Sequence, residues 1–169
     1  TPDLGLDAIG VLPGGELVFS IAEDVFSETL GPLHQGDLLS ERGRIVAPYA
    51  KLIGGFGRMP PVADQVLDAV QVLAADHFYF SIVNDFFSER LGVVIQRGDV
   101  LSNHGQVVKR HAQVLERFHP ADSKPDYGLD AIHFWPSGEL WFSVEQGFQD
   151  QQLGAVLAGD LLSDQGQVV

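Results

Sequence analysis

The sequence contains no cysteine among its 169 residues. Disulfide bonds, thiolate zinc sites and cysteine nucleophiles are therefore excluded. Long hydrophobic runs are also missing: no apolar segment approaches the roughly 20 residues that a membrane-spanning helix needs, so we expect no membrane span. Apolar residues make up 45% of the chain and charged residues 20%, a composition typical of globular rather than disordered proteins.

Basic residues are scarce, with 10 Lys and Arg against 23 Asp and Glu, and the net charge is −13. A chain this acidic repels phosphate backbones, so nucleic acid is excluded as an expected partner. Cations, neutral sugars and basic protein surfaces are left as candidate ligands. The chain begins with Thr1 rather than methionine, which fits a processed protein or an excised fragment; we predict an extracellular or periplasmic location.

Three tandem repeats organise the chain. The segment Leu6–Ile9 (LDAI) returns as Leu67–Val70 (LDAV) and as Leu129–Ile132 (LDAI), at spacings of 61 and 62 residues. Two further motifs recur in step: a Phe-Ser pair that ends in Ser20, Ser81 and Ser143, and a G-D-[LV]-L-S motif that ends in Ser40, Ser102 and Ser163. We therefore divide the chain into repeat 1 (residues 1–62), repeat 2 (63–124) and a truncated repeat 3 (125–169).

Each repeat has the pattern of about four antiparallel strands. In repeat 1 the apolar runs 6–12 and 17–21 flank a Pro-Gly-Gly-Glu turn, which is typical of a β-hairpin. A short strand over 37–40, a glycine-containing turn and a strand over 44–46 follow. The segment 22–35 shows no clear period. The connector after each of the first two repeats fits either a strand extension or a short helix.

The pattern L-D-A-[IV]…P-x-G-E-L-x-F-S…G-D-L-L-S resembles the tandem β-propeller-type repeats of secreted bacterial proteins of unknown function. The resemblance implies an all-β fold in which every repeat of about 61 residues is a roughly four-stranded antiparallel, propeller-like blade. A β-sandwich or a β-solenoid is the alternative. The signatures of WD40, sialidase and kelch blades are absent, so the resemblance implies none of the activities of those families.

Three blades are too few to surround an axis, because propellers close with roughly four to eight. An open array leaves a strand edge and an apolar blade face exposed. Two solutions are open at this point. The chain forms a homo-oligomer, most simply a dimer that completes six blades, or it belongs to a longer chain that carries further blades.

Aspartates are the most regularly repeated polar residues and the candidate metal ligands. Loop carboxylates with nearby backbone carbonyls supply the oxygen ligands that calcium prefers, so a calcium-stabilised fold is one hypothesis. The other is that these side chains cap turns by accepting backbone N–H groups, which the threefold repetition favours. The nine positions are Asp3, Asp64 and Asp126; Asp7, Asp68 and Asp130; and Asp37, Asp99 and Asp160.

Aromatic residues that break the repeat or lie in its variable segments are the candidate ligand-binding residues. Trp135 stands where the other repeats have leucine, and Trp141 where they have valine or tyrosine. Phe87 and Phe148 lie in the longer, variable segments. Tryptophan faces stack on sugars, and long loops on a repeated scaffold commonly bind ligands. Packing within the core or between blades is the competing interpretation.

No catalytic motif is present: the chain has no G-x-S-x-G, and its six histidines occupy no repeated position. The sequence therefore predicts a non-enzymatic binding or scaffold module that recognises a protein or a glycan. A fragment of a β-propeller hydrolase or lyase, with catalytic groups in a central channel, is the alternative.

Overall fold

The computed structural model describes residues 4–57, 67–122, 124 and 126–169. The protein is all-β, with 45% strand and 6% helix. Three four-stranded antiparallel sheets and three two-stranded hairpins follow one another, one of each in every repeat. The predicted fold class, three propeller-like blades, is confirmed. Within the described residues, neither helix has the length or the apolar character that crossing a membrane requires.

The same order of six strands recurs three times, and a short helix follows the strands of the first two repeats. Repeat 1 contains β1 (Leu6–Val11), β2 (Leu17–Ile21), β3 (Val25–Ser27), β4 (Gly31–Leu33), β5 (Leu38–Ser40), β6 (Arg44–Ala47) and α1 (Tyr49–Gly54). Repeat 2 contains β7 (Leu67–Ala74), β8 (His77–Ile82), β9 (Phe86–Ser88), β10 (Val93–Ile95), β11 (Val100–Ser102), β12 (Gln106–Lys109) and α2 (His111–Val114). Repeat 3 contains β13 (Ala131–Phe134), β14 (Leu140–Ser143), β15 (Phe148–Asp150), β16 (Gly154–Val156), β17 (Leu162–Ser163) and β18 (Gln167–Val168).

The four-stranded sheets have the orders β1-β2-β5-β6, β7-β8-β11-β12 and β13-β14-β17-β18. A hairpin (β3–β4, β9–β10 or β15–β16) is inserted between the second and third strands of each sheet. The aperiodic segment 22–35 is such a hairpin, and Gly31, with φ of 80°, provides the left-handed residue at its turn. The connectors that follow the first two sheets are the short helices α1 and α2.

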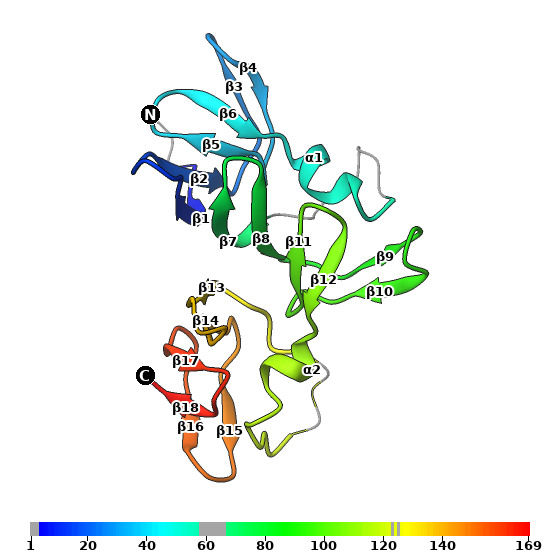
Figure 1. Cartoon of the computed structure of the whole chain (residues 1–169), viewed down its shortest axis with the longest axis vertical. Helices are drawn as coiled ribbons and strands as arrows, with labels where there is room; N and C mark the ends of the chain where they lie inside the picture. Colours follow the sequence, from blue (N-terminus) through cyan, green and yellow to red (C-terminus); the bar gives the residue numbers. More distant parts are fainter. Residues whose placement is uncertain (1–3, 58–66, 123, 125) are drawn as a thin grey trace.

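The repeats follow one another along the long axis of the molecule, and their first strands lie close together on one side (Figure 1). β1 contacts β7, and β7 contacts β13, so these three strands are the innermost ones. β1 and β7 approach closely at Gly10, where a Cβ would lie 3.2 Å from Val72 Cγ2. The helices and the hairpin β9–β10 lie on the opposite side (Figure 1).

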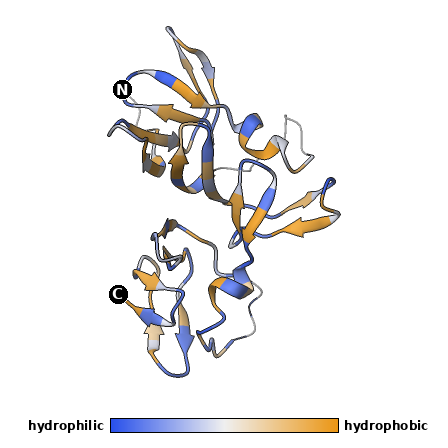
Figure 2. Ribbon diagram, in the orientation of Figure 1, coloured by the Kyte–Doolittle hydropathy of each residue, from blue (hydrophilic) through white to orange (hydrophobic). Residues whose placement is uncertain are grey.

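The hydrophobic core lies mainly between repeats rather than within them. We call the contact between repeats 1 and 2 the first junction and that between repeats 2 and 3 the second junction. At the first junction, residues of β1, β5 and α1 pack against residues of β7, β8 and β11; at the second, β11 and α2 pack against β13, β14 and β17. Hydrophobic stretches occur in the strands of all three repeats (Figure 2). Each sheet is therefore built to be covered on both faces.

Candidate functional site

Equivalent positions in the three repeats differ sharply in exposure at the start of the array. Leu67 and Leu129 are fully buried, because each packs at a junction with the preceding repeat. Their counterpart Leu6 is 70% exposed. We call this side of a sheet its leading face. In repeat 1 the leading face exposes Leu6, Ile9, Val11 and Leu17.

The opposite end of the array shows the reverse pattern. Leu38 and Val100 are fully buried at the first and second junctions, whereas their counterpart Leu161 is 41% exposed. We call this side of a sheet its trailing face. In repeat 3 the trailing face exposes Ala131, Trp135, Leu161 and Val169.

The two predicted tryptophans meet on this trailing face. Their ring centroids lie 5.0 Å apart with an interplanar angle of 75°, and Trp135 also makes an edge contact with His133. The indole N–H of Trp141 donates to Glu139 Oε1 at 2.9 Å, which fixes the orientation of that ring. Trp135 is 40% exposed, and Trp141 is half-buried. The pair therefore forms an ordered aromatic surface in contact with solvent.

The two predicted phenylalanines lie apart from this pair and from each other. Phe87 is exposed on hairpin β9–β10, opposite Val94. Phe148 is only 6% exposed and packs edge-on against Phe118 and at a tilt against Tyr127. The structure therefore places Phe87 at the surface and Phe148 in the core of the second junction.

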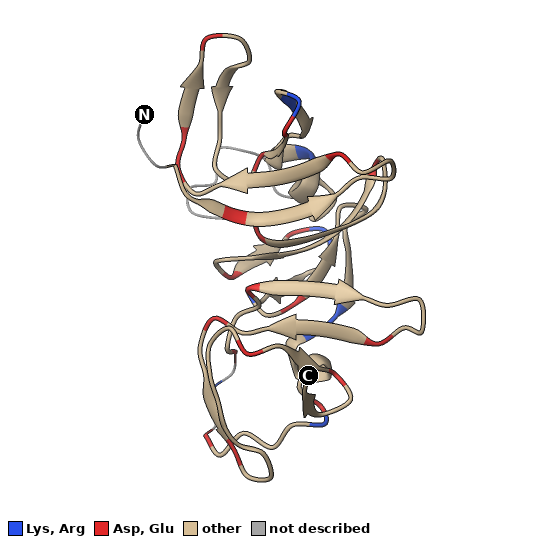
Figure 3. Ribbon diagram, turned by 90° about the vertical axis from the view of Figure 1, so that its left-hand side faces the viewer, with Lys and Arg blue, Asp and Glu red and all other residues tan. Residues whose placement is uncertain are grey.

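Three of the predicted aspartates converge on the innermost strands. A cavity of about 90 Å³ is lined by the Asp-Ala-[IV] segments of β1, β7 and β13, which contribute Asp7, Asp68 and Asp130. Burial and the nearby charge of Asp130 raise the pKa of Asp7. Acidic residues are spread over all three repeats (Figure 3), and in this cavity one repeated aspartate position from each repeat contributes to the lining.

The carboxyls of Asp68 and Glu145 meet across the second junction. Asp68 Oδ2 and Glu145 Oε1 are buried, and neither has a hydrogen-bond partner within the described part of the chain while both carboxyls are ionised. A proton on Asp68 supplies the missing donor. Burial, the hydrogen bond to Glu145 and the charges of Glu145, Asp130 and Asp7 raise the pKa of Asp68 to about 8. The other Glu145 oxygen accepts from Arg97 at 2.9 Å.

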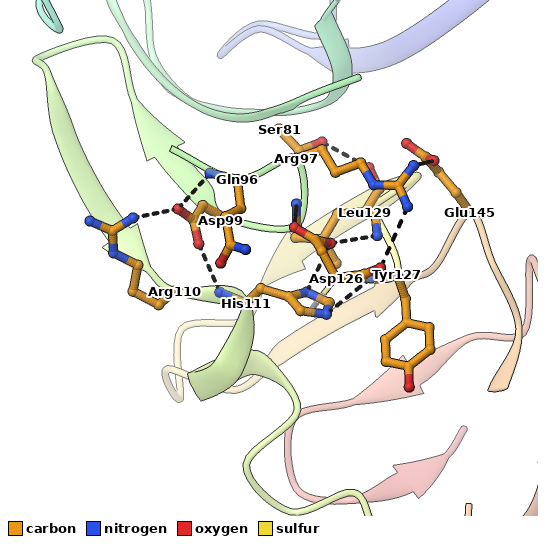
Figure 4. Close-up of polar contacts among 12 residues, drawn as sticks. Ser81, Gln96, Arg97, Asp99, Arg110, His111, Asp126, Tyr127, Leu129 and Glu145 are labelled. Carbon is orange, nitrogen blue, oxygen red and sulfur yellow. Dashed lines mark hydrogen bonds and ion pairs between the residues drawn. The ribbon is translucent and has the colours of Figure 1, made fainter. Parts of the chain in front are cut away.

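A buried polar network continues from Arg97 through the second junction (Figure 4). Asp126 accepts the backbone N–H groups of Gly98 and Gly128 at 2.9 and 2.7 Å. His111 Nε2 accepts the backbone N–H of Tyr127 at 3.2 Å, and its Nδ1 faces Asp126 Oδ1 at 3.6 Å. Burial lowers the pKa of His111, although the charge of Asp126 opposes this. The ring is therefore neutral near pH 7, with its proton on Nδ1.

The aspartates of the G-D-[LV]-L-S motif stabilise turns. Asp37, Asp99 and Asp160 each accept a backbone N–H from three residues earlier, and the first two also accept one from the start of α1 or α2. Asp3 and Asp64 lie outside the described residues. Among the residues that the structure does describe, no group of three or more His, Asp or Glu side chains is placed to hold a metal ion.

Sequence reasoning did not single out Arg97, His111 and Glu145. All three replace a different residue in repeat 1: Gln35, Tyr49 and Ala22. Such breaks in the repeat are the same signal that pointed to the tryptophans. Only the structure shows that these positions, far apart in sequence, meet at one junction.

No protein-family model matches this chain, and no curated protein matches its sequence. Solved structures align with most of this chain at TM-scores below 0.5. A virginiamycin B lyase from Staphylococcus aureus aligns with a TM-score of 0.36 and 13% identity, over 96% of this chain and 42% of the lyase. A streptogramin B lyase aligns with a TM-score of 0.36 and 16% identity, over 96% of this chain and 41% of the lyase. A protein of unknown function from Bacteroides caccae aligns with a TM-score of 0.34 and 12% identity, over 92% of this chain and 61% of that protein.

The chain thus spans about two fifths of the length of the two lyases. The lyase activity is a property of those proteins and is not transferred to this one.

Proposed function

We propose that this chain is a non-enzymatic binding and scaffold module that recognises a protein partner through the leading face of repeat 1 and the trailing face of repeat 3. The observation that carries the proposal is the exposure of Leu6 and Leu161 at positions that are fully buried in the other repeats. At the two junctions within the chain, the equivalent faces pack against the sheet of the neighbouring repeat. Contiguous exposed apolar surface on a folded protein marks an interaction site.

The axial cavity supports this assignment over an enzymatic one. Catalysis uses groups with different roles in one asymmetric site. The described lining of the cavity consists of the same three positions in each repeat, and it includes neither histidine nor arginine. The polar network at the second junction does combine His111, Arg97 and acids, but His111 and Asp126 are buried and occupied by backbone N–H groups.

Calcium stabilisation and an extracellular or periplasmic location stay predictions. Six of the nine aspartates lie at the axis or in the G-D-[LV]-L-S turns, and the turn carboxylates already accept backbone N–H groups. Thermal unfolding with and without EDTA tests the calcium hypothesis: a fall in Tm on chelation supports it, and an unchanged Tm rejects it.

Tryptophan fluorescence tests the proposed function, because Trp135 and Trp141 are the only tryptophans of the chain. Nile red is a suitable hydrophobic probe, since it is neutral and the protein carries a charge of −13. We expect the folded, dilute protein to bind the dye with energy transfer from tryptophan. Leu161→Asp should abolish most of this signal. Phe26→Asp, which changes an equally apolar side chain on hairpin β3–β4, should not.

Two results would contradict this proposal. Tryptophans that are shielded from acrylamide in the dilute monomer, without dye binding, would show that the trailing face is not available. A change in tryptophan emission with chitohexaose or cellohexaose, and none with the dye, would assign the face to glycans instead.

A further inference from the structure

We propose that two copies of this chain associate head to tail, with the leading face of repeat 1 in each copy packed against the trailing face of repeat 3 in the other, to close a ring of six repeats. The inference rests on the proposed function and specifies that the protein partner is a second copy of this chain. Both contacts would reproduce the junctions that already exist within one chain.

The two faces are complementary because the chain itself joins their counterparts twice. At the first junction, Leu38 on the trailing side packs in one cluster with Leu67 on the leading side. At the second junction, Val100 and Leu129 do the same. Within the described residues, no other repeat covers the leading face of repeat 1 or the trailing face of repeat 3, although part of that leading face packs against Leu33 of hairpin β3–β4. Because the two faces differ, the contact is heterologous, and such a contact closes when the rotation per unit fits the ring.

A repeated serine makes a hydrogen bond across each junction. Ser81 Oγ donates to the carbonyl of Leu129 in the next repeat at 2.9 Å, and Ser20 Oγ donates to that of Leu67 at 3.4 Å. Ser143 occupies the same position in repeat 3 but contacts Asp130 within its own repeat, at 3.4 Å. We infer that Ser143 donates to the carbonyl of Leu6 of the second copy. This hydrogen bond would align the junction between the two copies in the same register as the two junctions within one chain.

The ring would also complete the axial cavity. One copy lines it with the three innermost strands, which carry Asp7, Asp68 and Asp130. A second copy would place three more of these strands around the same axis. Six repeats lie within the range of roughly four to eight at which propellers close.

Net charge opposes the association, and its salt dependence identifies the driving force. Each copy carries −13, so two copies repel one another at low ionic strength. The exposed residues of the two faces are largely apolar. Added salt should therefore strengthen the dimer, whereas an interface held by ion pairs would weaken.

Sedimentation equilibrium at physiological salt tests the inference. We expect a mass of twice 18.3 kDa for the wild type. Leu6→Asp and Leu161→Asp should each weaken self-association on the order of 30-fold or more, because each places a charge in a desolvated interface. Phe26→Asp should leave association unchanged, since Phe26 is as exposed as Leu6 but lies on hairpin β3–β4.

Mixing the two variants distinguishes head-to-tail contact from other modes. A Leu6→Asp chain keeps its trailing face and a Leu161→Asp chain its leading face, so the mixture should form a heterodimer through one intact interface while each variant alone stays monomeric. A mixture that stays monomeric while the wild type dimerises overturns the head-to-tail arrangement. A wild type that stays at 18.3 kDa at every concentration and salt overturns the inference, and dye binding at the trailing face would then still support the proposed function.

Discussion

The two junctions of this protein have the same geometry and different chemistry. At the first, Tyr49 packs against Gly36 where α1 begins, and a Cβ on that glycine would lie 2.9 Å from the tyrosine ring. At the second, the equivalent residues are His111 and Gly98, and Arg97, Asp126 and Glu145 surround them. Repeat architecture therefore fixes where a side chain lies, while individual substitutions decide whether the junction responds to pH.

The ends of the chain form the third case of this comparison. They carry both halves of the same junction, unjoined within one copy. Substitutions of core residues should therefore lower the stability strongly at the two formed junctions and only weakly on the leading face of repeat 1.

Phe80 and Phe142 are fully buried at the two junctions, whereas their counterpart Phe19 is half-buried on the free leading face. We expect Phe80→Ala and Phe142→Ala each to lower the free energy of unfolding by about 3–5 kcal/mol. Phe19→Ala should cost roughly 1 kcal/mol, because fewer contacts are lost. Urea unfolding in a Leu161→Asp background, which keeps copies apart, measures all three. Equal losses at the three positions would refute the comparison.

Asp68 should make the second junction weaken as pH rises. Its pKa is raised from 3.8 to about 8, so the folded protein binds a proton that the unfolded chain releases. This contribution to stability is complete below about pH 4 and is lost as pH rises through about 8.

Asp68→Asn replaces the protonated carboxyl with an amide that still donates to Glu145. We expect the free energy of unfolding of the variant to exceed that of the wild type by a few kcal/mol at pH 9, because each unit of pKa shift corresponds to about 1.4 kcal/mol. Near pH 4 the two proteins should be similarly stable. Unfolding curves across this range give the answer. Glu23→Gln, at an exposed carboxyl that does not line this cavity, is the control. Parallel pH profiles for wild type and Asp68→Asn would rule out the shared proton.

The serine contacts should separate formed junctions from the free end. Ser81→Ala removes a buried hydrogen bond to Leu129 and should cost about 1 kcal/mol. Ser143→Ala should cost less in a monomer, because its hydroxyl makes only a long contact within its own repeat. Thermal unfolding in the Leu161→Asp background compares the two. A larger loss for Ser143→Ala would contradict the assignment of Ser81 as the contact across the junction.

His111 should add a small loss of stability on the acid side. Burial lowers its pKa below the ordinary 6.5, so its contribution is present above pH 6.5 and lost as pH falls through the folded value. His111→Tyr introduces the residue of the first junction and should remove this acid-side loss. Asp68 acts in the opposite direction with pH, so the Asp68→Asn background isolates the effect. An unchanged acid limb in His111→Tyr would show that another group causes it.

Much of the fold could be predicted because the three repeats share recognisable sequence motifs. The LDA[IV] strand, the P-x-G-E turn and the G-D-[LV]-L-S strand all lie where their hydrophobic period places them. The hairpin β3–β4 was missed, since its strands are three residues long and too short for a period to show. The connectors were open between strand and helix for the same reason.

The candidate site was less predictable, because it depends on contacts between repeats. The convergence of Asp7, Asp68 and Asp130 follows from strand order, which a local pattern does not contain. Trp135 and Trp141 could be named from the broken repeat, but not their place on an exposed trailing face. Asp68 belongs to the repeated aspartates and Glu145 breaks the repeat, but neither pattern shows that the two residues pair.

The accessibility of one repeated position tests the central claim most directly. The chain has no cysteine, so Leu6→Cys, Leu67→Cys and Leu129→Cys each introduce a single thiol at equivalent sites. In a Leu161→Asp background, we predict that Leu6→Cys reacts rapidly with a thiol reagent and that the other two react only on unfolding, in line with exposures of 70%, 0% and 0%. Equal reaction rates at the three positions would contradict the claim that the end faces are unformed copies of the junctions.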